Sequence, residues 1–191
     1  MRLSRLAYYI DFFLSAALVA CLAGYAASPA TSIQILQWLL TVCLGAIVWT
    51  VIEYGVHRVI YHHAPYFRDL HDAHHARPNA YIGAPPLIGI IIIIAVFFAP
   101  VVTVSAVAAT GLTAGVLLGY MAYMLIHHAA HHWVLTPQSW LYRTRRHHSL
   151  HHHNSTRGNF GITTSFWDHA FGTAIETHRP SRSATRLPRY K

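Results

Sequence analysis

Two long stretches without a charged residue dominate this sequence. Residues 12–52 contain no Asp, Glu, Lys or Arg, and residues 78–142 contain none either. A soluble domain usually carries about 25% charged residues, whereas this chain of 191 residues carries 10%, and 54% of its residues are hydrophobic. The chain lacks the polar surface of a soluble protein, so we expect an integral membrane protein.

Each stretch is long enough for two transmembrane helices, since one span needs about 20 apolar residues. Ser28, Pro29 and Ser32 interrupt the first stretch near its middle. We predict an all-α, polytopic membrane protein with four spans in two hairpins, at about residues 6–27, 33–52, 87–107 and 112–130. The first stretch is long and aromatic at its start, so we interpret it as a retained span and not as a cleavable signal peptide.

The distribution of cations predicts the orientation. Arg2 and Arg5 precede the first span, three arginines lie between the second and third spans, and the other nine cations follow the fourth. By the positive-inside rule, we expect both termini to be cytoplasmic, with a cytoplasmic helical cap of residues 53–86 and 131–178. Residues 1–178 then form one domain. The basic tail, residues 179–191, is expected to be flexible and suits anionic lipid headgroups better than nucleic acid.

Two smaller patterns indicate local structure. Gly111, Gly115 and Gly119 repeat every four residues, which predicts close helix packing within the bundle. Thr136, which precedes a proline, predicts the start of a cytoplasmic helix that runs towards His153.

All 17 histidines lie between His57 and His178, in the predicted cytoplasmic segments and at the adjoining helix ends. Positions i, i+3 and i+4 share one helix face, so the HxxHH cluster of residues 71–75 can converge on one point. The HxxHH cluster of residues 148–152 repeats this spacing. His57 and His62 lie about 140° apart on a regular helix, so they converge only where the helix ends or bends, unless they bind different metals.

Imidazole suits Zn, Cu, Fe and Ni, and these clusters offer more nitrogens than one ion can bind. We therefore predict a site for two metals. For some histidines we expect an ordinary polar or surface role instead: His63, His147, His153, His169 and His178.

Longer motifs surround the histidines. Residues 53–62 fit EYxxHRxxxH, residues 71–78 fit HxxHHxxP, and residues 159–173 read NFGITTSFWDHAFGT. Over residues 53–173 the chain resembles the integral-membrane fatty acid hydroxylase and sterol desaturase superfamily, and within it the fatty acid hydroxylase group. The resemblance implies four spans and a cytoplasmic cap with two non-haem irons bound by histidine. Zinc is the alternative ion, since imidazole accepts both.

The resemblance also implies a set of site residues. It selects His127 over His128 and His148 over His147. The implied ligands are His57, His62, His71, His74, His75, His127, His131, His148, His151 and His152. Candidates for their hydrogen-bonding partners, which can equally be caps or surface residues, are Glu53, Asp72, Asn154 and Asp168.

The implied function is that of an O2-dependent oxidoreductase that hydroxylates a lipid, with a fatty acyl chain as the favoured substrate. An unactivated C–H bond is too strong for side-chain acid–base chemistry, so the metals have to carry the reaction. Desaturation, sterol oxidation and carotenoid hydroxylation are alternatives within the superfamily. The chain has no GxGxxG motif and no cysteine cluster, so we expect a separate electron donor, either a reductase or a haem or ferredoxin-type carrier.

A metal transporter or a non-catalytic metal-binding membrane protein is the alternative from another class. Transporters place polar ligands near the bilayer midplane, whereas residues 12–50 and 87–123 contain no His, Asp or Glu. This distribution favours the enzyme.

Overall fold

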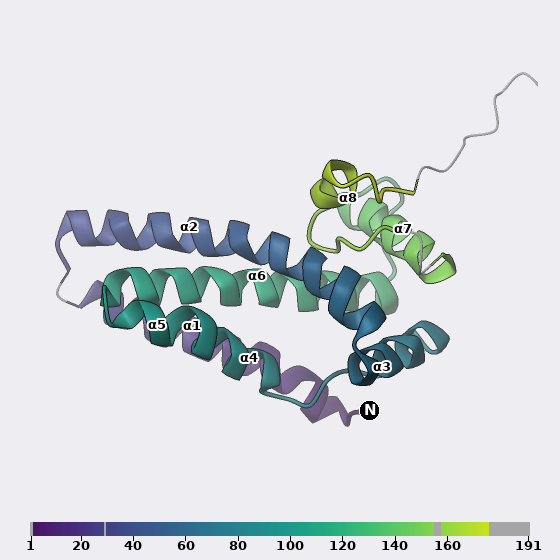
Figure 1. Ribbon diagram of the computed structural model, residues 1–191, viewed down its shortest axis with the longest axis horizontal. Coiled ribbons are helices and arrows are strands. Elements are labelled where there is room, and N and C mark those ends of the chain that lie inside the picture. Colours follow the sequence, from purple (N-terminus) through teal and green to yellow (C-terminus); the bar gives the residue numbers. More distant parts are fainter. Residues whose placement is uncertain (1, 29, 155–157, 176–191) are drawn as a thin grey trace, which may run out of the picture.

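The computed structural model describes residues 2–28, 30–154 and 158–175, and the regular structure of this part of the chain is helical (Figure 1). Three long helices form an elongated stem: α1 (Arg5–Ala27), α2 (Ser32–Gly55) and α6 (Ala106–His132). A broken helical segment lies beside them: α4 (Ile88–Ile93), η2 (Ile94–Phe98) and α5 (Ala99–Val102). The all-α prediction is confirmed for the described residues.

The remaining elements gather at one end of the stem (Figure 1). They are η1 (Val56–Tyr61), α3 (Pro65–Ala76), α7 (Trp140–His153) and α8 (Phe166–Ala170). We call the described residues of 56–86 and 133–175 the head. The predicted tail, residues 179–191, lies outside the described residues, as does His178.

Three helices are long and apolar enough to cross a membrane: Arg5–Ala27, Ser32–Tyr61 and Ala106–His132. The span predicted at residues 87–107 coincides with a shorter apolar segment, Ile88–Val102, so the fourth span remains a prediction. The last long helix begins earlier than residue 112, and the turn before it ends at residue 105 instead of lying at 108–111. The reason is local, because the Ser105 side chain accepts a hydrogen bond from the amide of Ala108 and caps the helix there.

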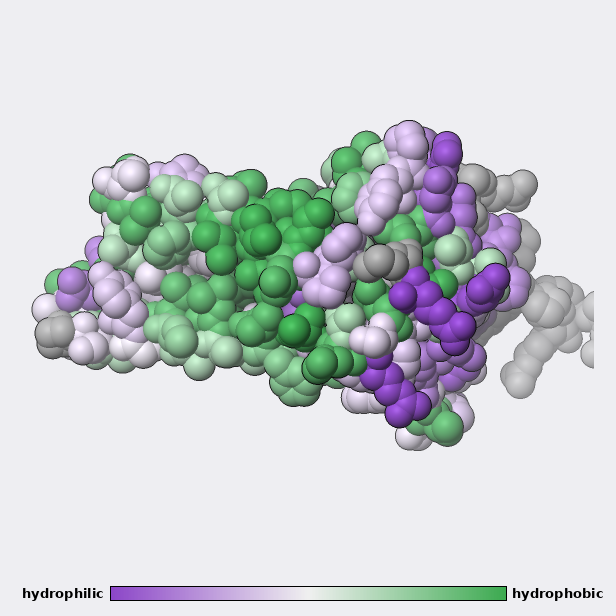
Figure 2. All heavy atoms as spheres, turned by 90° about the horizontal axis from the view of Figure 1, so that it is seen from below, coloured by the Kyte–Doolittle hydropathy of each residue, from purple (hydrophilic) through white to green (hydrophobic). Residues whose placement is uncertain are grey.

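The surface of the stem is apolar, whereas polar residues gather on the head (Figure 2). Large side chains on α2 are exposed, among them Leu36, Leu40 and Ile47. An exposed apolar surface of this extent is unfavourable in water, but it is suited to lipid. The composition of the stem is therefore explained by a membrane environment.

The N-terminus lies at the head end of the stem (Figure 1). The amide of Leu3 donates to the Tyr81 carbonyl oxygen at 2.7 Å, and Arg2 forms an isolated β-bridge with Ile82. The described arginines lie just before α1, at its first residue or in the head, and among the described residues none lies in the turns at the other end of the stem. This placement agrees with the predicted topology, while the side of the membrane on which the head lies remains a prediction.

The glycines of α6 face α2, as the packing prediction requires. A Cβ atom on Gly115 would overlap the Val42 carbonyl oxygen and lie 2.9 Å from the amide nitrogen of Ala46. Gly45 of α2 approaches the same stretch of α6, where its Cβ would lie 2.9 Å from the Val116 amide nitrogen. Close approach of these backbones aligns the head end of α6, which carries histidines, with that of α2, which continues into η1 and His57.

The predicted cytoplasmic helix is present as α7, but its start differs from the prediction. Ser139, and not Thr136, is the N-cap, because the Ser139 hydroxyl accepts the amide of Tyr142 at 3.1 Å. The helix ends at His153, as expected.

The α2–α6 contact gives a direct test. We expect Gly115→Ala to lower the free energy of unfolding by about 1–3 kcal/mol, the usual cost of overpacking. Gly24→Ala is the matched control, because a Cβ at Gly24 meets no atom within 4 Å. Thermal unfolding in detergent measures both, and equal melting temperatures for the two variants would contradict this account of the packing.

Candidate metal centre

Nine of the ten predicted ligands lie in two groups of converging imidazoles. In each group the possible ligand atoms all lie within 4.8 Å of one another. The first histidine group consists of His57, His62, His71 and His151. The second histidine group consists of His74, His127, His131, His148 and His152.

A π-helical turn brings His57 and His62 together. The i→i+5 hydrogen bonds of a π-helix widen the turn, so residues five apart lie nearly above one another. Their rings stack with centroids 5.6 Å apart and an angle of 16° between the planes. Two histidines five residues apart cannot share a face of a regular α-helix, and the π-helical turn η1 is the deviation that lets them do so.

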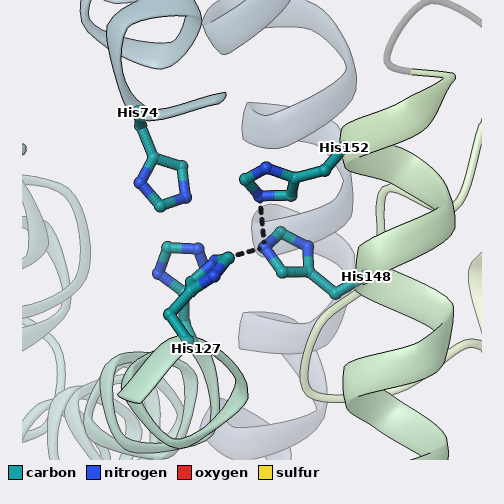
Figure 3. A group of neighbouring side chains, drawn as sticks. His74, His127, His148 and His152 are labelled. Atoms are coloured by element: carbon teal, nitrogen blue, oxygen red, sulfur yellow. Dashed lines mark hydrogen bonds between the residues drawn. The ribbon is translucent and has the colours of Figure 1, made fainter. Parts of the chain in front are cut away.

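Three helices supply the second group. His127 and His131 lie one turn apart on α6, His148 and His152 lie one turn apart on α7, and His74 comes from α3. Figure 3 shows the rings of His74, His127, His148 and His152 turned towards one another. The helical i, i+4 spacing explains both pairs.

Backbone carbonyls fix the tautomers of two rings in the first group. His57 Nδ1 lies 2.5 Å from the Phe160 carbonyl oxygen, and His151 Nδ1 lies 2.9 Å from that of Gly158. A carbonyl oxygen only accepts, so each Nδ1 carries the proton and donates it. The two Nε2 atoms, 3.0 Å apart, therefore present facing lone pairs when the rings are neutral. Facing lone pairs repel, and a cation between them converts the repulsion into coordination.

The nitrogen spacing fits such an ion. His71 Nε2 lies 3.2 Å from His57 Nε2 and 3.4 Å from His151 Nε2. Nitrogens bound at about 2.1 Å to one ion are separated by about 3.0–3.4 Å in octahedral or tetrahedral geometry. In the second group, His148 Nε2 lies 2.9 Å from His131 Nε2 and 3.0 Å from His152 Nε2. Both groups have the donor type and spacing of a metal site.

Some of these nitrogens are buried without a partner. Among the described residues, His62 Nε2 and His74 Nε2 make no hydrogen bond. Leaving a buried polar atom unpaired costs about 1–3 kcal/mol. Coordination of a metal would satisfy both atoms.

Burial keeps the rings in the form that binds metal. Desolvation, reinforced by the charge of neighbouring imidazoles, lowers the pKa of His74 to about 3. Desolvation also lowers the pKa values of His151 and His152 to about 4. These rings are neutral at pH 7, and the neutral imidazole is the metal ligand.

His75 is the predicted ligand outside both groups. Its ring stacks on that of His152, with centroids 4.1 Å apart, and lies 4.3 Å from the ring of His71. Its Nε2 is buried and has no hydrogen-bond partner among the described residues. His75 therefore lies between the two groups.

Asp168 is fully buried and organises the loop of residues 158–173. Its Oδ1 accepts the Phe160 amide and the Thr173 hydroxyl, each at 2.8 Å. Its Oδ2 accepts the Gly161 amide at 2.8 Å and lies 3.1 Å from Nε2 of His147. Burial alone would raise the pKa of this carboxyl, but the hydrogen bonds outweigh it and lower the pKa. Asp168 therefore acts on His57 through the Phe160 backbone and not by direct contact.

Glu53 fixes the same loop to α2. Its Oε1 accepts the amides of Ile162 at 2.5 Å and of Thr163 at 3.0 Å, and its Oε2 contacts the Thr163 hydroxyl. Glu53 lies four residues before His57. The carboxylate therefore holds the loop beside the ligand-bearing turn.

The other two candidate partners lie elsewhere. Asp72 is exposed on α3. Asn154 is the C-cap of α7, and its side chain donates to the Leu150 carbonyl oxygen at 3.5 Å. Within the described part of the chain, no hydrogen bond joins either residue to a ring of the two groups.

The histidines that we did not expect to be ligands lie outside both groups as far as they are described. His63, His153 and His169 are exposed, and His147 faces Asp168. His128, next to a predicted ligand, lies 3.4 Å from the Tyr8 hydroxyl instead.

A cavity of about 80 Å³ touches both groups. Two of its lining residues belong to the first group, His57 and His71, and two to the second, His74 and His127. Apolar side chains complete much of the wall, among them Phe67, Leu70, Ile82 and Ile162. Ligand pockets usually span about 300–1,000 Å³, so this cavity suits part of an apolar ligand, such as a few methylene groups.

Sequence reasoning overlooked the backbone carbonyls of Gly158 and Phe160, which accept hydrogen bonds from two candidate ligands, His151 and His57. A signal was present in the NFG motif and the glycine before it. Gly158 has φ +155°, and a Cβ there would overlap the Thr173 carbonyl oxygen. Only glycine fits this position without strain.

The lowered pKa values predict acid sensitivity of the metal-free protein. Unfolded histidine has a pKa of about 6.5, whereas His74 and His151 accept protons only near pH 3–4 in the folded state. Between these values the unfolded state binds more protons, so stability is lost as pH falls. We expect the melting temperature of chelator-treated protein to fall steadily from pH 7 to pH 4.5. Replacing exposed His63 and His153 by Gln should leave this slope unchanged, and a flat profile would contradict the buried neutral cluster.

The role of Asp168 gives a second test. Asn keeps the shape of Asp168 but replaces one acceptor oxygen by an NH2 donor. At least one backbone amide of the loop, that of Phe160 or Gly161, then loses its hydrogen-bond acceptor. We expect Asp168→Asn to weaken metal binding about 10–100-fold, the usual effect of losing a group that supports a ligand. Equilibrium dialysis with Fe²⁺ or Zn²⁺ measures this. Exposed Asp72→Asn is the matched control, and equal affinities in the two variants would refute the role of Asp168.

Comparison with known proteins identifies the family. The family model for fatty acid hydroxylase matches residues 42–173. The chain is 32% identical over 144 residues to fatty acid 2-hydroxylase of Rattus norvegicus, covering 69% of this chain and 38% of that protein. It is also 32% identical over 151 residues to the ceramide very long chain fatty acid hydroxylase SCS7 of Saccharomyces cerevisiae, covering 72% of this chain and 38% of that protein.

The chain therefore spans about two fifths of the length of these relatives. A solved structure, described as full-length Scs7p with only the hydroxylase domain visible, superposes with a TM-score of 0.74 at 28% identity. That match covers 91% of this chain and 69% of the solved chain. The resemblance seen in the sequence motifs is confirmed, and the chain belongs to the fatty acid hydroxylase family.

Proposed function

We propose that this protein is a membrane-bound, metal-dependent oxidoreductase that hydroxylates a C–H bond of a fatty acyl chain. The observation that carries the proposal is the pair of histidine groups beside one cavity with apolar walls. Both groups lie within the segment that matches the family model. A metal-storing protein has no need of an apolar cavity that touches both groups.

We further propose that the substrate carbon is carbon 2 of the acyl chain. The similar proteins named above act on fatty acids or on fatty acids of ceramides, and one is a 2-hydroxylase. Carbon 2 lies next to the carbonyl group, so the polar end of the lipid must come close to the head while its chain extends towards the stem. The substrate is then a free fatty acid or a ceramide-type lipid.

We propose two iron ions as the cofactor, one associated with each group. Bound iron would activate O2, the oxidant of the reaction, which no side chain can do, and imidazole donors suit iron. Zinc accepts the same donors, so metal content has to be measured together with activity. The proposed ligands are the nine residues of the two groups together with His75.

The chain's own residues prepare the site. The carbonyl groups of Phe160 and Gly158 hold the protons on the outer nitrogens of His57 and His151, which leaves the inner nitrogens free to coordinate. Burial keeps the rings neutral, and the apolar cavity wall positions methylene groups and excludes water. Hydrogen bonds of this kind, from the outer nitrogen of a histidine to a carbonyl oxygen, orient metal ligands in other proteins.

The reaction requires an electron donor. Hydroxylation converts RH, O2, two electrons and two protons into ROH and water, so each turnover consumes two electrons. We propose that a separate reductase or one-electron carrier supplies them. We also propose four spans, with both termini and the head on the cytoplasmic side, which agrees with the arginines at the head end of the stem.

Lipid analysis tests the proposal. Cells that express the protein should accumulate 2-hydroxy fatty acids, detected by mass spectrometry as a gain of one oxygen. We expect His74→Ala and His151→Ala to abolish this product, because each removes a proposed ligand from a different group. His153→Ala, at an exposed position on the same helix as His151, is the control that should retain activity.

The possible outcomes separate the alternatives. A product that has lost two hydrogens would identify a desaturase, and metal-loaded protein without any lipid product would identify a non-catalytic metal-binding protein. Wild-type activity in both ligand variants would refute the proposed site.

A further inference from the structure

We propose that the loop of residues 78–86 is a lid over the cavity, held shut by Arg2 and Leu3, and that it opens to admit a lipid chain. We call residues 78–86 the lid loop and residues 2–3 the latch. The identity of the ligand rests on the proposed function, whereas the lid and the latch are argued from contacts within this chain.

The size of the cavity requires a movable wall. Its volume is about 80 Å³, whereas ligand pockets usually span about 300–1,000 Å³. Carbon 2 of an acyl chain has the polar end of the lipid on one side and the rest of the chain on the other. A lipid with this carbon in the cavity therefore extends beyond the cavity in two directions, so part of the wall must move before the lipid can enter.

Most of the wall cannot move without disturbing the candidate metal centre. The elements η1, α3 and α6 each contribute a proposed ligand to the wall. Ile162 belongs to the loop of residues 158–173, whose carbonyls accept hydrogen bonds from His57 and His151. The remaining wall is made by residues 82–84. These lie in the lid loop, which carries no proposed ligand.

The lid loop lies between two fixed points. At one end the amide of Arg77 donates to the His74 carbonyl oxygen at 3.1 Å, and at the other the amide of Leu87 donates to Asp11 Oδ1 at 2.7 Å. Residues 78–86 are all described, none of them is buried and none lies in a helix. Segments with few buried contacts open at a low cost in free energy, and loops of this kind close many active sites.

The latch holds the wall of the cavity directly. The Leu3 amide donates to the Tyr81 carbonyl oxygen at 2.7 Å, and Arg2 forms the antiparallel bridge with Ile82. The Leu3 side chain also lies against Gly83, because a Cβ atom there would be 3.4 Å from Leu3 Cδ1. Ile82 and Gly83 both line the cavity, so release of the latch frees this part of the wall.

The ring of Tyr81 makes a second contact that can separate without moving a ligand. Its centroid lies 4.8 Å from that of Tyr8 and 5.6 Å from that of His132, and it is tilted by 21° from the His132 ring. Neither Tyr8 nor His132 belongs to a histidine group. The lid loop can therefore lift while the proposed ligands stay in place.

The position of the lid loop favours a lipid as the ligand. The loop joins α3 of the head to α4 of the stem and passes beside the N-terminus (Figure 1). An opened lid thus exposes the cavity at the head end of the apolar stem. This is the level at which the polar end of a lipid and its chain meet.

A reversible cross-link tests the lid. Arg2→Cys/Ile82→Cys is introduced together with Cys21→Ser/Cys43→Ser, and the full chain is placed in nanodiscs of zwitterionic lipid. Residues opposite one another in an antiparallel pair have Cα atoms about 4.5–5.5 Å apart, and disulfides span about 4.4–6.8 Å between Cα atoms. Diamide, an oxidant without a metal, therefore closes the disulfide, and a phosphine reductant reopens it.

The probe is a palmitic acid analogue with a diazirine near its carboxyl end, and chelator-treated protein is used, so the result does not depend on turnover. Mass spectrometry of α3, which carries the wall residues Phe67 and Leu70, measures photolabelling. We expect oxidation to slow labelling about tenfold or more, because the chain cannot pass a closed lid, and reduction to restore it. The single variants Arg2→Cys and Ile82→Cys, in the same background, are the controls that diamide should leave unchanged.

A second pair of variants tests the latch without a cross-link. Leu3→Pro removes the amide that donates to Tyr81, whereas Leu3→Ala shortens the same side chain and keeps this donor. We expect Leu3→Pro to be labelled about fivefold faster than Leu3→Ala, as the loss of one hydrogen bond predicts. Thermal unfolding checks that both variants are folded, and equal labelling of the two would overturn the latch.

The outcomes separate the lid from the proposed function. Equal labelling of the oxidised and reduced double variant would overturn the lid. Absence of labelling in both forms would also overturn it, because no lipid chain would then reach the cavity. Redox-controlled labelling of a protein that forms no hydroxylated lipid when loaded with metal would instead count against the proposed function alone.

Discussion

The structure depends on imidazole lone pairs that are aimed at one another in a buried site. In the first group, the carbonyls of Phe160 and Gly158 accept hydrogen bonds from Nδ1–H of His57 and His151. Each neutral ring has only this one N–H group, so the facing Nε2 atoms are left as acceptors. Such an arrangement is unfavourable without a cation, so the packing around it must supply the stability. The close contact between α2 and α6 does so, because Gly45 and Gly115 let the two backbones meet. The rigid pair then carries its histidines into the head at fixed separation.

The loop of residues 158–173 connects the stem to the chemistry. Glu53 holds this loop from α2, and Asp168 holds it from within. Both carboxylates accept hydrogen bonds from backbone amides, and among the described residues neither is hydrogen-bonded to a ring of the two histidine groups. The loop in turn offers its carbonyls to His57 and His151. Two acidic residues thus support the tautomers of His57 and His151 from outside the two histidine groups, neither of which contains a carboxylate.

Much of this arrangement followed from the sequence, because it depends on local spacing. The i, i+3 and i, i+4 intervals predicted histidines that converge from α3, α6 and α7, and the uncharged runs predicted the long apolar helices. The π-helical turn at His57 and His62 was not predicted, although the sequence showed that a regular helix could not align them. Helix caps were also missed where two candidates compete, as with Ser139 and Thr136. Backbone contacts between distant segments leave no side-chain pattern, which is why the role of Gly158 appeared only in three dimensions.

The use of backbone carbonyls explains why the motif after the last histidine cluster is as specific as the histidines. A carbonyl oxygen is present at every residue, so its position, and not its identity, decides whether it can hold a ring. The position is set by the left-handed conformation of Gly158, by the buried Asn159 and by the amides that Asp168 binds. Changing any of these residues would shift a backbone carbonyl that accepts a hydrogen bond from a histidine, even though the substituted side chain is not itself the acceptor. The residues from 158 to 173 are therefore part of the candidate metal centre in a physical sense, although none of them is a proposed ligand.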